Sequence, residues 1–197
     1  MIRVMASGIC GTDLDIDRGE YMGNYPVIPG TSSQIHIFTG GHMADLLEQL
    51  LQQERELQFE SFDETTAWEL GCQLVERART EGLPVVVDIQ HGTHQLFHAS
   101  LPGSAPDNDE WVKRKARAAI RFGHSSLYMG ELLKSRGQTI EKNYLVPESE
   151  VAPHGGSFPV IVKGTGIVGT VTVSGLPAQD DHKLVVEGIR DYLASRQ

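Results

Sequence analysis

The side chains best suited to chemistry are the histidines after residue 40 and the basic residues between positions 113 and 121. Imidazole is a common axial ligand of haem iron, and charge-assisted bonds from Arg114, Lys115 and Arg121 would suit the propionate carboxylates of haem. We therefore expect a domain that binds haem or a similar tetrapyrrole, with one histidine as the axial ligand. The five candidate ligands are His91, His94, His98, His124 and His154.

The alternative is that these histidines lie in turns and strands and bind nothing. No H-x-x-x-H motif falls on a predicted helix, and no other metal-ligand spacing is present in this part of the chain. We therefore predict no metal site, and we assign no catalytic residues. The cofactor is left open, with haem as a candidate.

A second hypothesis places a subunit interface or a small anionic ligand on the basic segment. Trp111 beside Arg114 and Lys115 has the composition of an interface anchor. Ser125 and Ser126, if they precede a helix, would offer hydroxyls and free amides to an anion. The alternative is that Trp111 lies in the core and the basic residues form an exposed face. The predicted ligand-binding residues are Asn108, Trp111, Arg114, Lys115, Arg121, His124, Ser125, Ser126 and His154.

Residues 164–169 match the dinucleotide-binding pattern G-x-G-x-x-G, with Glu187 about 20 positions after it. That pattern binds pyrophosphate only where a helix starts at the glycines. Here residues 170–173 are all β-branched, which favours a strand, and Glu187 falls within a helical pattern. We therefore predict a β-hairpin, with strands over 158–163 and 167–173.

The remaining pattern predicts the elements that would position these residues. Helical spacing of leucines starts at Met43, and Asp63 is a plausible N-cap for a second helix that ends at Gly82. A final helix is expected to be capped by Asp180 or Asp181. The other predictions are a hairpin of strands over 85–89 and 95–101, a long helix from Glu110, a helix over 127–136 and polar connecting chain over 137–153. The order indicates an α+β domain whose antiparallel sheet is covered by helices.

Composition excludes several classes of protein. The chain has 197 residues, enough for one domain with a sizeable core, and its net charge of −9 argues against general nucleic-acid binding. We expect no membrane partner, because no apolar run reaches the ~20 residues of a membrane-spanning helix and the N-terminus lacks a signal-peptide pattern. These features predict a cytoplasmic protein. Cys10 and Cys72 indicate neither a disulfide framework nor a cysteine-based metal site.

The first 30 residues differ from the rest of the chain. ASGICGTDL at 6–14 and YPVIPG at 25–30 resemble the catalytic-zinc region of medium-chain, zinc-dependent alcohol dehydrogenases. In that family the cysteine matching Cys10 binds zinc and a His-Glu pair follows the PVIPG segment, where this chain has Thr31 and Ser32. Catalytic zinc needs three protein ligands, so we interpret the segment as a gene-fusion or start-site remnant. Residues 1–42 are predicted to be a poorly ordered leader and linker before a domain at 43–197.

Several segments between Met43 and Arg196 resemble a second family. They are LFH from Leu96, PDN from Pro106, WVKRK from Trp111, RFGHSS from Arg121, HGGSFPV from His154, VSG from Val173 and DDH from Asp180. The last three of these segments, with GIVG at 166–169, resemble the haem-degrading, GlcG/HbpS-like domain, and the first four look more narrowly like its UPF0303 branch. The resemblance implies profilin-like α-β-α layers around an antiparallel sheet, and homo-oligomers. It implies less about activity, because fold does not determine function.

Residues and resemblance together predict a UPF0303-type protein that binds haem or a small anionic ligand within a homo-oligomer. One alternative is a non-catalytic interaction or assembly module. Another is the remnant of a zinc- and NAD-dependent dehydrogenase, indicated only by residues 6–30. Whether the protein catalyses a reaction is left open.

Overall fold

The computed structural model describes residues 40–196, and residues 1–39 and 197 lie outside the described part. The predicted leader and the dehydrogenase-like segment therefore fall almost wholly outside it. The elements in chain order are α1 (Gly40–Glu56), β1 (Gln58–Phe59), α2 (Glu64–Glu81), β2 (Val86–His91), β3 (His94–Ser100), α3 (Pro106–Phe122), α4 (Ser126–Ser135), α5 (Ile140–Tyr144), β4 (Ser157–Val162), β5 (Gly166–Ser174) and α6 (Ala178–Ala194).

The strands form one five-stranded sheet in the order β1-β4-β5-β2-β3. Both predicted hairpins are present, because β2 pairs with β3 and β4 pairs with β5, all antiparallel, and β5 also pairs antiparallel with β2. Gly164 (φ +72°) and Gly166 (φ +104°) make the turn between β4 and β5. The G-x-G-x-x-G match therefore lies in a hairpin, and no helix starts at its glycines.

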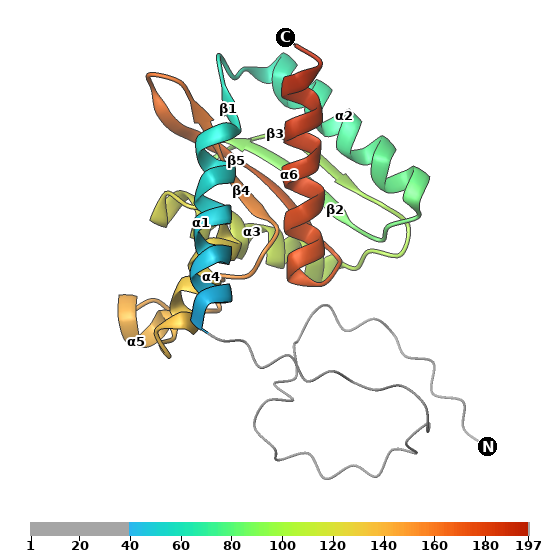
Figure 1. The fold of residues 1–197 in the computed structure, drawn as a ribbon. Helices are drawn as coiled ribbons and strands as arrows, with labels where there is room; N and C mark the ends of the chain where they lie inside the picture. The colour runs from blue at the N-terminus through green and yellow to red at the C-terminus, as the bar shows by residue number, and fades with distance from the viewer. Residues whose placement is uncertain (1–39, 197) are drawn as a thin grey trace, which may run out of the picture.

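Helices cover both faces of the sheet, as an α+β domain with α-β-α layers requires (Figure 1). Helices α2 and α6 lie side by side on one face, and α3 lies on the other. The core between the sheet and α2 and α6 is apolar, and it includes the fully buried side chains of Val87, Ile89, Phe158, Val171 and Val173. This face contains the hydrophobic half of the period-2 pattern that the sequence shows.

The other half of the pattern faces α3 and is polar. In the sheet register Ser157 pairs with Thr172, Thr172 with Asp88, and Asp88 with His98, so these four residues form one row across β4, β5, β2 and β3. Ser157, Thr172 and Asp88 are fully buried. Burying polar groups is unfavourable unless they are hydrogen-bonded, so each of them must find a specific partner in this layer.

Several predicted boundaries are confirmed by the structure. The Asp63 side chain accepts a hydrogen bond from Thr66 N at 2.8 Å and caps α2, which ends at Gly82 in the left-handed conformation. Helix α4 matches the predicted helix over 127–136 to within one residue, and Ser125 is its N-cap. No helix within residues 40–196 is long and apolar enough to cross a bilayer.

Other predicted boundaries are wrong. Helix α3 starts at Pro106, four residues before Glu110, because proline fits the first turn and Asn108 Oδ1 accepts from Ala105 N at 2.8 Å. Residues 137–153 include the short helix α5. Neither Asp180 nor Asp181 caps α6, since both lie inside its first turn, after Pro177. The strand β1, which pairs parallel with β4, was not predicted, because two residues carry no periodic pattern.

Candidate functional site

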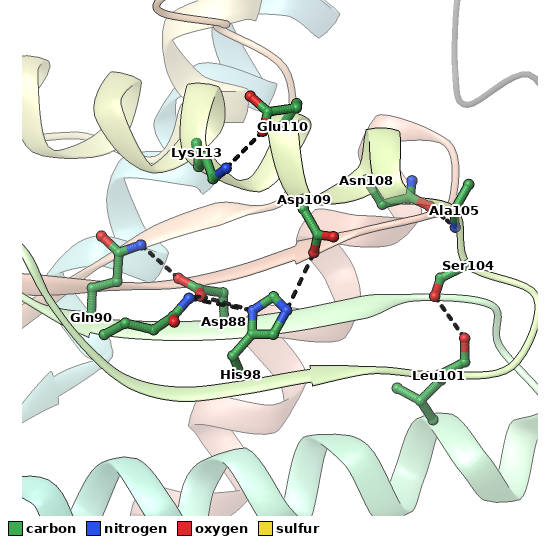
Figure 2. A network of polar contacts seen from close by, with 11 residues as sticks. Asp88, Gln90, His98, Leu101, Ser104, Ala105, Asn108, Asp109, Glu110 and Lys113 are labelled. Atoms are coloured by element: carbon green, nitrogen blue, oxygen red, sulfur yellow. Dashed lines mark hydrogen bonds and ion pairs between the residues drawn. The ribbon is translucent and has the colours of Figure 1, made fainter.

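Asp88 is the centre of the polar layer beneath α3 (Figure 2). Its carboxylate Oδ1 accepts a hydrogen bond from Gln90 Nε2 at 2.7 Å, and Oδ2 accepts from Gln95 Nε2. His98 Nδ1 lies 3.1 Å from the same Oδ2 atom. Three side chains from β2 and β3 therefore direct their nitrogens at one buried carboxylate, which fixes the orientation of each of them.

His98 lies between two carboxylates. While Nδ1 faces Asp88, Nε2 lies 3.2 Å from Oδ1 of Asp109 in the first turns of α3. About a third of the His98 side chain is exposed. This histidine was predicted as a candidate axial ligand or as a packed strand residue. The structure places both of its ring nitrogens against carboxylate oxygens, and its ligand role stays a prediction.

Lys115, predicted to bind a ligand, is buried inside the protein. Its ammonium Nζ donates to Asp181 Oδ2 at 2.7 Å and lies 3.4 Å from Val173 O and from Ser174 Oγ. Gly156 leaves room for it, since a Cβ on Gly156 would lie 2.9 Å from Nζ. Burial raises the pKa of Asp181 to about 6, against the opposing effect of Lys115. This buried pair joins α3 to the start of α6.

The anion site predicted at the start of α4 holds a carboxylate of the protein itself. Glu54 from α1 is buried, and its oxygens lie 2.7 Å from Ser125 N and 2.7 Å from His124 Nδ1. The hydrogen bond with Glu54 raises the pKa of His124 above its usual value. Ser126 is also buried, and its hydroxyl accepts from Ser157 N at 3.0 Å. These three predicted residues thus connect α1, α4 and β4.

Three other predicted residues form a stacked cluster. The Arg114 guanidinium lies 4.0 Å from the ring centroid of Trp111, and the His154 ring meets the same indole edge-on at 5.3 Å. Asp107 accepts from Trp111 Nε1 at 3.0 Å, and His154 Nε2 lies 2.5 Å from a carboxylate oxygen of Glu148. We call Trp111, Arg114 and His154 the tryptophan cluster. All three residues are half-buried.

A groove of about 520 Å³ lies between α3 and the turn that joins β2 to β3. Lys113, Arg117 and Arg121 lie along it at four-residue intervals on α3, so their side chains share one face of the helix. Gln90, from the Asp88 network, also lines this groove. We call this space the α3 groove. Its remaining lining residues are Gly92, Thr93, Ala116, Ile120, Glu150 and Val151.

The cations of the α3 groove are only partly neutralised. Lys113 pairs with Glu110 at 2.6 Å, and Arg117 Nε donates to the backbone carbonyl of Glu150 at 2.6 Å. Within residues 40–196, neither Arg117 nor Arg121 forms an ion pair with a carboxylate. Glu150 is the one acidic residue that lines the groove. The groove is therefore a positively charged site on an acidic chain.

The predicted site residues thus separate into five places. Arg121 lines the α3 groove, Lys115 is in the buried ion pair, Asn108 caps α3, and the rest lie in the Glu54 contacts or the tryptophan cluster. Sequence reasoning missed Lys113 and Arg117, although the recurrence of a basic residue every four positions, at 113, 117 and 121, was a readable signal. It also missed Asp88 and Gln90, whose role depends on strand register.

The histidines at the β2–β3 turn do not line the groove. His91 and His94 are exposed, and the His91 ring stacks on Phe62 with 6.4 Å between ring centroids. Phe62 packs against the apolar core, so His91 lies on the α2 and α6 side of the sheet. Within the described part of the chain, no group of three or more His, Cys, Asp or Glu residues is arranged to hold a metal ion.

Comparisons with known proteins agree with this fold. A family model described as "Haem degrading protein HbpS-like" matches residues 62–190. A UPF0303 protein of Streptomyces coelicolor is 48% identical over 150 residues, which are 76% of this chain and 95% of that protein. One from Rhizobium etli is 49% identical over 150 residues, 76% of this chain and 91% of its own. None of these supports the dehydrogenase resemblance of residues 6–30.

Solved structures give the same result. The crystal structure of the Ybr137w protein is 32% identical, with a TM-score of 0.70, over 77% of this chain and 90% of its own. HbpS (22% identical, TM-score 0.55, 69% of this chain and 92% of that one) and a PduOC complex with haem (19%, 0.55, 66% and 94%) share the fold alone. The chain belongs to the HbpS-like haem-degrading family and, within it, to the UPF0303 proteins.

Proposed function

We propose that the α3 groove binds a small anionic ligand that carries two or more acidic groups. The observation that carries this proposal is the row of Lys113, Arg117 and Arg121, in which both guanidinium groups lack a carboxylate partner among the described residues. Like charges four residues apart destabilise a helix by about 0.2–0.5 kcal/mol per pair, so the row does not serve helix stability. Acidic groups of a ligand would make charge-assisted hydrogen bonds with it.

Haem belongs to this class of ligand through its two propionates, and the family makes it the first to consider. The α3 groove offers cations to the propionates and the apolar side chains of Ala116, Ile120 and Val151 to a ring. None of its lining residues is a histidine, so it offers no imidazole to the iron. The groove therefore fits the acidic groups of haem and does not fit its metal. We propose recognition through acid groups.

The test is calorimetric titration with three probes: haemin, protoporphyrin IX, which has the same propionates without iron, and citrate. We expect the Arg117→Gln/Arg121→Gln variant to weaken binding of the probes tenfold or more, since each charged hydrogen bond contributes about 1.5–3 kcal/mol. Arg190→Gln is the matched control, because Arg190 is exposed on α6, on the other side of the sheet. Unchanged affinity in the double variant, or equal loss in the control, would refute the proposal.

The same titrations decide between acid-group and iron recognition. We expect His→Ala variants of the five candidate ligands to leave the binding of haemin intact. Haemin binding without protoporphyrin binding, together with a Soret shift lost in one histidine variant, would contradict recognition through acid groups. That outcome would restore the axial-ligand hypothesis for the histidine concerned.

A second function, assembly of a homo-oligomer, is favoured by the tryptophan cluster. Its aromatic ring and guanidinium are held in place by Asp107 and by stacking, and pre-ordered Trp and Arg side chains are frequent interface anchors. We propose that this cluster lies at a subunit contact. Light scattering on Trp111→Ala and Arg114→Glu tests it: both should lower the particle mass. An unchanged mass in both variants would exclude the cluster from the interface.

A further inference from the structure

The amide of Gln90 is held in one orientation by the residue beneath it. Every contact of the Asp88 carboxylate is with a nitrogen, so its oxygens act as acceptors towards Gln90, Gln95 and His98. Gln90 must therefore present its NH2 group, whose Nε2 lies 2.7 Å from Asp88 Oδ1. Figure 2 shows the carbonyl oxygen of the same amide on the side away from Asp88.

This carbonyl oxygen is an unused acceptor in a groove that is otherwise rich in donors. Gln90 lines the α3 groove with Lys113, Arg117 and Arg121, and its Oε1 makes no hydrogen bond to any described residue. The acidic groups of a ligand would be satisfied by the three cations. Ionised acidic groups cannot donate a hydrogen bond to Oε1, because Oε1 is itself an acceptor and needs an O–H or N–H donor. A ligand made of carboxylates alone would offer this acceptor no donor.

We propose that Gln90 selects a ligand bearing a hydroxyl or amino group beside its acidic groups, that is, a hydroxy- or amino-polycarboxylate. Asp88 is the positioning residue, because it fixes the amide without lining the groove. This inference rests on the proposed anion site and goes beyond it by naming the class of ligand. It also separates that class from haem, whose propionates carry no such donor.

Besides Gln90, the buried Asp88 carboxylate holds Gln95 and His98 in place. A charge placed in a central strand costs stability unless donors surround it, and an apolar residue would serve the fold at least as well. Asp88 lies on β2, between β5 and β3, and is fully buried. Its three donors include one side chain that reaches the α3 groove, Gln90, and one that does not, Gln95. The pair Gln90 and Gln95 therefore supplies a natural control.

The experiment compares citrate with tricarballylate, its analogue without the hydroxyl, by calorimetry in buffer free of divalent cations. We expect the wild-type protein to bind citrate up to about tenfold more tightly, the effect of one hydrogen bond of about 1.5 kcal/mol. Gln90→Met keeps the length of the side chain, removes the acceptor and should abolish this preference. Gln95→Met removes an amide from Asp88 outside the groove and should retain it.

The outcomes separate this inference from the proposed function. Equal binding of the two probes, with loss in the Arg117→Gln/Arg121→Gln variant, would overturn the role of Gln90 and leave the anion site standing. A preference that persists in Gln90→Met would also overturn it. Binding of neither probe would overturn the inference about Gln90, and the titrations with haemin and protoporphyrin IX would then decide the anion site. The wild-type comparison needs no variant, so the inference stays falsifiable even if Gln90→Met fails to fold.

Discussion

The two faces of the sheet are built on opposite physical principles from alternate residues of the same strands. Towards α2 and α6, Val87, Ile89 and Val171 pack in a continuous apolar core. Towards α3, their neighbours Asp88 and Thr172 are equally buried but polar. The apolar face needs only side chains of suitable size, whereas each polar residue needs a particular partner in a particular geometry. The α3 groove lies on the face that needs partners.

The largest effect on the polar face is expected from removing one half of the buried ion pair. Lys115→Met leaves the Asp181 carboxylate buried without its partner and should lower the free energy of unfolding by about 3–5 kcal/mol. Lys115→Met combined with Asp181→Leu should recover much of this loss, because no uncompensated charge remains. Urea denaturation of the single and double variants measures both values.

The matched control lies on the apolar face. Ile89→Ala should cost about 2–5 kcal/mol, and adding Val171→Ala, its neighbour in the sheet register, should make the loss larger. Rescue by the second change is thus expected on the polar face alone. If the Lys115 and Asp181 double variant were as unstable as the sum of its singles, the contrast between the faces would be wrong.

The free energy of unfolding should also depend on pH through the buried ion pair. We expect this contribution to be about 2–3 kcal/mol, from about 1.4 kcal/mol per pKa unit. Burial raises the pKa of Asp181 to about 6 from the 3.8 of an unperturbed aspartate. The folded protein therefore binds more protons between these values. This contribution to stability is fully present below about pH 4 and is lost as the pH rises through 6.

Urea denaturation at several pH values, compared between wild type and Asp181→Asn, isolates this contribution. Their difference in unfolding free energy should change between pH 4 and 6 and be flat above pH 7. Carboxylates with lowered pKa values, such as Asp63 and Glu69, change in the opposite sense, and they cancel in the comparison. A difference that is constant from pH 4 to 7 would show that burial does not control Asp181.

The smallest effect is expected from the hydroxyl pair in the polar row. Ser157 Oγ and Thr172 Oγ1 lie 2.8 Å apart, and both are buried. Thr172→Val leaves the Ser157 hydroxyl without this partner and should cost about 1–2 kcal/mol. Adding Ser157→Ala should return stability towards wild type. A thermal-unfolding double-mutant cycle with no coupling between the two changes would contradict the partner-dependent view of this face.

The sequence predicted the elements that depend on local patterns, and it did not predict the long-range partners on the polar face. The apolar alternation in β4 and β5, and the Asp63 cap, are local signals, so both hairpins and α2 were predicted correctly. Partners on the polar face are not local. Lys115 meets Asp181 across 66 positions, and Glu54 reaches Ser125 across 71. No pattern in a single sequence indicates such distant pairs. Several residues that were predicted to bind a ligand therefore contact other helices and strands of the protein in the structure.

The α3 groove could be predicted in part from the sequence. The four-residue spacing of Lys113, Arg117 and Arg121 is a helical pattern that the sequence displays, and only Arg121 of the three was selected from it. The orientation of Gln90 depends instead on Asp88 and on the register of β2 against β3. The charge of the site could thus have been predicted from the sequence, whereas the orientation of the Gln90 amide required the structure.

A crystal structure of the protein grown with citrate would locate the bound anion. We expect citrate carboxylates within hydrogen-bonding distance of Arg117 and Arg121, with the citrate hydroxyl on Oε1 of Gln90. Citrate bound at the tryptophan cluster, or an α3 groove that remains empty at saturating citrate, would contradict this expectation.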